Sequence, residues 1–195
     1  MIFINQKEKM VKDLLVEIDG YFMNLVYLKD LINVEEHMAN ASSISELAPN
    51  FSLIVQCALY DSYALCLMKL YDKSEKANTI PNLIKKCKKN VQLFHSPNEV
   101  SKKLEEFENK LSSDEYITHA IETLRLRRDQ YHAHNDKKYF GVKIANDKSH
   151  LQKYYIWFLR NFTEEVLSYL WSQLSDKKCR ETKYNNDLDN LLQQK

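Results

Sequence analysis

The chain has 195 residues, of which 44% are hydrophobic and 28% charged, and its formal net charge is +1. This composition is typical of a soluble globular protein. The near balance of charge excludes a uniformly basic nucleic-acid binder, so any nucleic-acid contact must come from a local patch. Only two glycines and three prolines occur, which excludes most sheet-rich folds and favours long helices.

The cysteines and the apolar segments indicate a cellular location. The four cysteines lie far apart and form no Cys-x-x-Cys pair, which argues against zinc and favours free thiols. The segment from Met1 to Lys12 lacks the long apolar core of a signal peptide. No run of about 18 consecutive apolar residues predicts a membrane span. We therefore expect a cytoplasmic protein that does not contact a membrane.

Apolar residues recur in steps of three and four along most of the chain, which is the pattern of amphipathic helices. The first expected helix, at about 5–40, carries such a stripe, which includes Leu14 and Ile18. The second, at about 46–72, is apolar on more than one face. We expect this second helix to be the buried centre of a helical bundle.

Three further helices are expected between the middle of the chain and residue 133. A short helix at about 80–94 is followed by a strongly charged one at about 98–111, which we expect at the surface. Ser112 and Glu115 have the spacing of a capping box, in which a serine caps a helix and a glutamate lies three residues later. We therefore expect Ser112 to begin a fifth helix that runs to about residue 133.

The last part of the chain contains one more long apolar stripe. Residues 137–148 are expected to form a loop, and Ser149 is expected to cap a sixth helix at about 150–175. The sequence thus predicts an all-α fold, an antiparallel helical bundle formed as a single domain by residues 1–176. A polar C-terminal tail with a possible short helix is expected at 177–195.

One arginine departs from this regular pattern. Arg128 falls on the apolar stripe that contains Ile121, Leu124 and Tyr131. A charge on such a face costs free energy unless it is paired or lies at a cleft. An ion pair with a buried carboxylate such as Asp61 would be a sufficient structural explanation if the arginine were alone.

The arginine is not alone, because residues 127–136 read RRDQYHAHND and hold two arginines, two histidines and two aspartates. This segment lies where the fifth helix is expected to end. The helix dipole favours a protonated imidazole at that end, so a histidine there can titrate near neutral pH.

The segment resembles the signature of the HEPN superfamily, which is an arginine followed after four to six residues by a histidine. Arg128-Asp129 followed by Ala133-His134 is similar to the form in the abortive-infection, AbiU-type branch. Arg127 and His132 also satisfy the spacing. We prefer Arg128 and His134 because the neighbouring positions then match as well.

The resemblance extends upstream of this segment. Three blocks, at 58–62, 70–72 and 79–84, look like the same branch and occur in the same order. The similar region covers roughly residues 50–140. An HEPN-like helical bundle is the fold that this resemblance implies.

The resemblance also implies an activity: metal-independent cleavage of RNA that leaves a cyclic phosphate, without a cofactor. Arginine suits the phosphate because its planar, permanently charged fork binds phosphate oxygens, and histidine suits proton transfer. Arg128 and His134 are thus the expected catalytic pair, with Asp129 orienting either group and His132 as an accessory. The implied partners are an RNA substrate, a second copy that completes a composite active site, and an antitoxin.

Geometry limits how the catalytic pair can meet. Six residues of a straight helix turn by roughly 240° and rise by about 9 Å, so Arg128 and His134 would point in different directions. Either the helix unwinds before His134, or the site is shared between two chains.

RNA binding also requires positive charge near the motif. Arg125, Arg127, Lys137 and Lys138 flank it and are the expected RNA-binding residues. A second cluster at 85–89 contains four lysines, although such runs are more often solvated helix faces.

Other functions have weaker support. His132, His134 and Asp136 match a His-x-His-x-Asp metal motif only superficially, because no strand is expected before them. No glycine-rich phosphate loop or Glu-x-x-His pair occurs. The main alternative is a non-catalytic helical module that binds RNA or mediates dimerisation.

Overall fold

The computed structural model describes residues 6–40, 46, 48–129 and 152–179, and within these ranges the regular structure is helical throughout. The prediction of an all-α fold is confirmed. The elements are α1 (Gln6–Asn40), α3 (Pro49–Leu70), α4 (Ile80–Lys89), the short 3-10 helix η1 (Val91–Leu93), α5 (Pro97–Ser113), α6 (Glu115–Arg127) and α7 (Lys153–Ser172).

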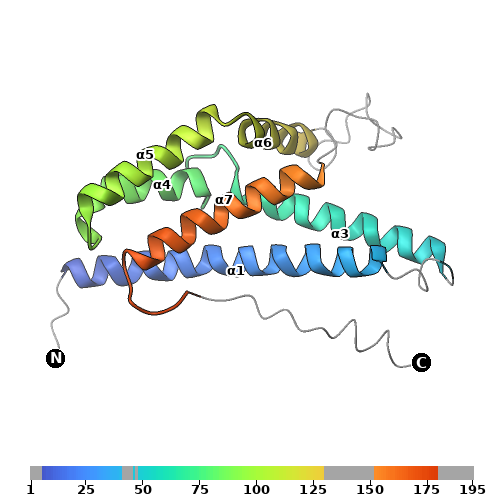
Figure 1. Ribbon diagram of the computed structural model, residues 1–195, viewed down its shortest axis with the longest axis horizontal. Coiled ribbons are helices and arrows are strands. Elements are labelled where there is room, and N and C mark those ends of the chain that lie inside the picture. The colour runs from blue at the N-terminus through green and yellow to red at the C-terminus, as the bar shows by residue number, and fades with distance from the viewer. Residues whose placement is uncertain (1–5, 41–45, 47, 130–151, 180–195) are drawn as a thin grey trace.

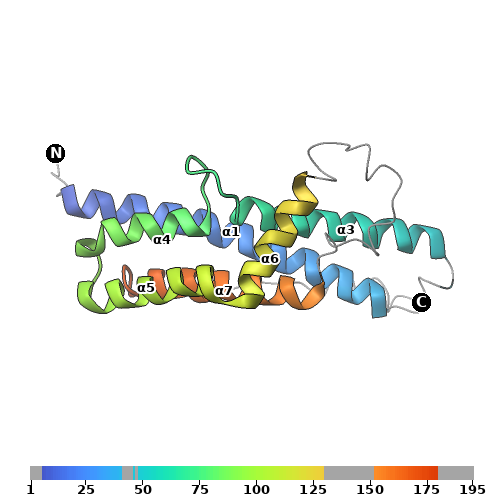
Figure 2. The same cartoon turned by 90° about the horizontal axis from the view of Figure 1, so that it is seen from above.

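Helix α1 extends along the bundle, and α3 and α7 pack against it while running in the opposite direction (Figure 1). Helix α5 packs on α4 and leads into α6. Helix α6 then crosses obliquely over α3 and α7 and contacts both (Figure 2). The C-terminal end of α6 is thereby brought to the C-terminal half of α3, which is the region that contains the candidate site.

The hydrophobic core is continuous and every α-helix contributes to it. Its fully buried members include Leu28, Leu67, Ile84, Leu104, Ala120 and Leu167. Buried hydrogen bonds accompany this apolar packing. The hydroxyl of Tyr71 hydrogen-bonds to Thr163 Oγ1 at 2.7 Å and to the carbonyl oxygen of Leu159 at 3.0 Å. This contact joins the end of α3 to the middle of α7, and burial raises the pKa of Tyr71.

The expectation that the second helix is the buried centre of the bundle is wrong for its first half. The side chains of Phe51, Leu53 and Ile54 are exposed, whereas Tyr63 to Leu70 supply most of the buried residues of α3. The reason is geometric, because α6 and α7 lie by the second half of α3 and do not extend along its first half (Figures 1 and 2). The apolar composition of α3 therefore did not predict its burial, because burial also depends on how far the neighbouring helices extend along it.

Helix α3 is also long and apolar enough to cross a membrane by length and composition, although Asp61 and Lys69 interrupt it. It is the one helix of the described ranges with this property, which the sequence analysis did not anticipate. The core helix of a soluble protein shares these features, and the second half of α3 lies in the core.

The cap of α6 differs from the expected one. The Asp114 carboxylate accepts hydrogen bonds from the backbone N–H groups of Tyr116 at 3.0 Å and Ile117 at 3.1 Å. The predicted cap, Ser112, instead lies in the last turn of α5 and donates to the carbonyl oxygens of that turn. The prediction was wrong because α5 continues to Ser113, two residues further than its apolar stripe suggested.

Several expectations concern residues that the structure does not describe. The expected end of the fifth helix near residue 133, the loop at 137–148 and the cap at Ser149 lie outside the described ranges. The boundary between the domain at 1–176 and the tail at 177–195 stays a prediction.

Candidate active site

The candidate site begins where α6 ends. Helix α6 ends at Arg127, and Arg128 and Asp129 continue from it in a π-helical stretch. Such turns are rare and are often found at functional sites, because they change the direction of the side chains that follow. Arg128 itself keeps helical backbone angles, with φ −56° and ψ −53°, and its backbone N–H donates to the carbonyl oxygens of Leu124 and Arg125.

Arg127 points into the protein. Its side chain is 1% exposed, and its Nη2 donates to Asp61 Oδ1 at 2.5 Å. Its guanidinium also lies over the ring of Tyr60, 4.6 Å from the centroid. Both partners belong to α3, so Arg127 fastens the end of α6 to that helix.

The ion pair to Asp61 was considered for Arg128, and the structure assigns it to the neighbouring arginine. Successive residues of a helix point about 100° apart, so only one of two adjacent arginines can face α3. Leu124 and Arg127 are buried on the same face of α6. The stripe therefore continues by a step of three to Arg127, where the sequence analysis had assumed a step of four to Arg128.

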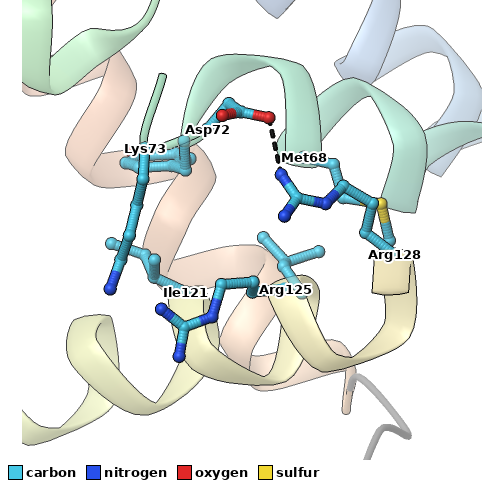
Figure 3. Close-up of a pocket in the computed structure, with 8 residues that line it drawn as sticks. Met68, Asp72, Lys73, Ile121, Arg125 and Arg128 are labelled. Carbon is cyan, nitrogen blue, oxygen red and sulfur yellow. Dashed lines mark hydrogen bonds and ion pairs between the residues drawn. The ribbon is translucent and has the colours of Figure 1, made fainter. Parts of the chain in front are cut away.

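Arg128 points away from this contact and is partly exposed. Its Nη1 donates to Asp72 Oδ2 at 2.7 Å, and its Nε donates to Asp129 Oδ1 at 2.8 Å (Figure 3). The hydrogen bond that Arg128 donates to Asp129, together with the negative charges of Asp129 and Asp72, raises the pKa of Arg128, so the guanidinium stays charged. Asp72 is itself held in place, because its Oδ1 accepts the backbone N–H of Ser74 at 2.7 Å.

Arg128 forms part of the wall of a hollow of about 290 Å³ between α6 and the end of α3. Figure 3 shows Lys73 reaching into this region from the segment after α3, opposite Arg125 and Arg128 from α6. The floor is apolar and includes Met68, Ile121 and Leu124. The hollow thus has three cationic side chains over an apolar base.

The structure brings together some of the predicted site residues. Arg125, Arg128 and Asp129 meet at or beside the hollow, whereas the guanidinium of Arg127 is buried against α3. The other predicted residues lie outside the described ranges, and these are His132, His134, Lys137 and Lys138.

Asp72 and Lys73 also line the hollow, and neither was among the predicted site residues. A signal for Asp72 was present, because the block at 70–72 belongs to the region that resembles the HEPN branch. Its role was not evident, since nothing in the chain order shows that the end of α3 faces the end of α6.

The described residues contain no cluster of three or more histidine, cysteine or acidic side chains that could hold a metal ion. The His132, His134 and Asp136 motif lies outside these residues.

The model of one family, HEPN_AbiU2 (AbiU2), matches residues 11–194. No curated protein sequence and no solved structure matches the chain.

Proposed function

Because this chain belongs to the AbiU2 family of HEPN domains, we propose that it is a metal-independent endoribonuclease. We also propose a biological role as the toxic component of an abortive-infection or toxin–antitoxin system in the cytoplasm. The family name supplies the defence context, and the chemistry at the end of α6 supports RNA cleavage.

The observation that carries the proposal is the contrast between the two adjacent arginines. An arginine that binds a substrate phosphate must be reachable, and Arg127, at 1% exposure, is held by Asp61 and Tyr60. Arg128 has a side-chain exposure of 37% and lies on the wall of the hollow. This difference supports the signature register Arg128 and His134 over Arg127 and His132.

The hydrogen bonds of Arg128 leave room for a ligand. Its Nε and one Nη1 proton are engaged by Asp129 and Asp72, while Nη2 has no hydrogen bond within the described part of the chain. The two carboxylates hold the fork in one orientation, which reduces the entropy lost when a phosphate binds. In this scheme Asp129 and Asp72 position Arg128 and do not contact RNA.

In the proposed reaction the 2′-oxygen of the RNA attacks the adjacent phosphorus. The new P–O2′ bond forms as the P–O5′ bond breaks, which leaves a 2′,3′-cyclic phosphate and a 5′-hydroxyl. One imidazole accepts the proton of the 2′-hydroxyl, and a second donates a proton to the departing 5′-oxygen. Arg128 stabilises the negative charge that develops on the phosphorane oxygens.

The reaction calls for two imidazoles, and we assign the main role to His134. A homodimer would supply one His134 from each chain and thus form the composite site that the family resemblance implies. His132 is the accessory residue of this scheme, and Lys137 and Lys138 contribute positive charge. An antitoxin protein is the expected regulator of such an enzyme.

The test is cleavage of RNA by the purified full chain in the presence of EDTA. The proposal predicts cyclic-phosphate ends for the wild-type protein and their loss in both Arg128→Ala and His134→Ala. Lys102→Ala is the matched control, because Lys102 is an exposed lysine of α5 that does not line the hollow at Arg128 and makes no ion pair among the described residues. If the wild-type protein binds RNA without cutting it, the chain is the non-catalytic module instead.

A further inference from the structure

A second, larger hollow adjoins the one that contains Arg128. It has a volume of about 1190 Å³ and lies between the start of α4, the end of α5 and α6. Four residues line both hollows, namely Tyr71, Asp72, Lys73 and Ile121. The two hollows therefore form one continuous groove that leads from Arg128 past Lys73 to Lys85.

The charge along this groove is predominantly positive and unneutralised. Lys73, Lys85 and Arg125 line it and make no ion pair within the described residues. The two carboxylates of the groove are already paired, since Asp72 binds Arg128 at 2.7 Å and Glu108 binds Lys88 at 2.6 Å. Three cations thus remain available to an anionic ligand.

The lysine cluster at 85–89 does not act as one surface. Lys86 forms an ion pair with Glu17 of α1, and Lys88 pairs with Glu108 of α5. Of the four lysines, Lys85 alone lines the groove. Lys89 also makes no ion pair within the described residues, but it does not line the groove. Lys85 is therefore the lysine of this cluster that combines an unpaired charge with a place in the groove.

The groove also offers neutral polar groups. The side-chain amide of Asn109 lines it and makes no hydrogen bond within the described residues. An amide both donates and accepts, so it can bind a ribose hydroxyl or the edge of a base. Cations spaced along a groove with a free amide between them are suited to a chain of phosphates and sugars, because one small anion would occupy only one of these positions.

We propose that this groove, with Lys73, Lys85 and Arg125 as its phosphate-binding side chains, holds the single-stranded RNA on one side of the cleaved bond. The inference rests on the proposed endoribonuclease function. A single strand is favoured because the 2′-oxygen must line up with the departing 5′-oxygen, which a stacked duplex prevents, and unpaired nucleotides are those that proteins can splay into a groove. Arg128 lies at one end of the groove, where the cleaved phosphate would lie, and Lys85 marks the other end.

Binding is measured with a fluorescently labelled single-stranded RNA by anisotropy, in the non-cleaving His134→Ala background. Each phosphate contact on a single strand contributes about 0.7 to the slope of log affinity against log salt. Removing one contact should thus weaken binding by about fourfold at 0.15 M salt, and removing three by about 50-fold. The variants are Lys73→Gln, Lys85→Gln and Arg125→Gln, singly and together, with Lys102→Gln as the matched control.

The groove assignment predicts that the triple variant loses about 2 from the salt slope while Lys102→Gln changes nothing. All four side chains are at the surface or partly exposed, so thermal unfolding should be unchanged and a binding loss can be attributed to the groove. Equal affinity and equal salt slope for the triple variant and the control would overturn the assignment of RNA to the groove. The proposed endoribonuclease function would then still be tested separately by the cleavage assay. Absence of both RNA binding and cleavage by the wild-type chain would overturn the groove and the proposed function together.

Discussion

The contact between Arg127 and α3 makes a quantitative prediction about stability. The change is Asp61→Ala, which removes the carboxylate that accepts from Arg127 Nη2 at 2.5 Å. Breaking a fully buried ion pair costs about 3–5 kcal/mol because it leaves a buried charge. Here the Asp61 side chain is 44% exposed, so water can enter the vacated space and solvate the guanidinium. We therefore expect a loss close to that of one charge-assisted hydrogen bond, about 2 kcal/mol.

The assay is urea and thermal unfolding of the full chain, followed by circular dichroism. For a protein of this size, a loss of 1 kcal/mol lowers Tm by about 2–4 °C, so the expected shift is about 4–8 °C. The matched control is Asp72→Ala, which removes the partner of Arg128 together with the exposed hydrogen bond from the Ser74 backbone N–H. That ion pair has side-chain exposures of 37% and 30%, and such pairs contribute at most about 1 kcal/mol.

A double variant makes the test more specific. When Arg127→Met accompanies Asp61→Ala, no buried charge remains and the methionine retains the packing on Tyr60. Part of the lost stability should return, because replacing a buried ion pair by apolar groups is far less destabilising than removing one partner. The reasoning is refuted if Asp61→Ala destabilises no more than Asp72→Ala, or if the double variant is less stable than Asp61→Ala by a further 2 kcal/mol or so.

The remaining predictions concern a helix cap, a buried hydroxyl and two thiols. Asp114→Ala should lower the free energy of unfolding by about 1 kcal/mol because the cap of α6 is lost, whereas Ser112→Ala should be near neutral in the same urea titration. Tyr71→Phe should lower the free energy of unfolding by about 1–2 kcal/mol, because the hydrogen-bonding groups of α7 lose a buried partner. A free energy of unfolding equal to that of the wild type would contradict this. A thiol reagent at pH 8 should label the exposed Cys57 rapidly and Cys87 only on unfolding, because burial raises the pKa of Cys87 from 9.0 to about 12. Between pH 9 and about pH 12, the Cys87 thiol therefore stays protonated in the folded chain and ionises in the unfolded chain. Its contribution to the free energy of unfolding should be fully present below pH 9 and fall as the pH rises above that value.

The sequence predicted the elements whose signal is local. Helix α1 was expected at about 5–40 and spans Gln6–Asn40, because an uninterrupted apolar stripe covers its length. The helix expected at about 98–111 is Pro97–Ser113, and proline at its first turn marks the start. These features depend on the spacing of neighbouring residues along one helix.

Features that depend on how helices cross could not be predicted in this way. The exposure of Phe51, Leu53 and Ile54 follows from where α6 and α7 end along α3. The assignment of Asp61 to Arg127 instead of Arg128 follows from the crossing of α6 over α3, which turns one of the two arginines inward. A step of one residue in a helix changes direction by about 100°, and no pattern of apolar residues resolves that choice for adjacent arginines.

The candidate site also combines residues that local spacing predicts with residues that only the crossing of helices brings in. The motif and Arg128 were evident from the spacing of arginine and histidine, and Arg125 from its position one turn before. Asp72, Lys73 and Lys85 became part of the site only through the contact between the end of α3, the start of α4 and α6.

Arg128 is proposed to be the arginine that acts on RNA, and Arg127 a structural one. The most direct measurement compares Arg128→Ala with Arg127→Met for both RNA cleavage in EDTA and thermal unfolding. The account predicts that Arg128→Ala abolishes cleavage with Tm nearly unchanged, because its ion pairs are partly exposed, while Arg127→Met lowers Tm. Cleavage at the wild-type rate by Arg128→Ala would contradict the account.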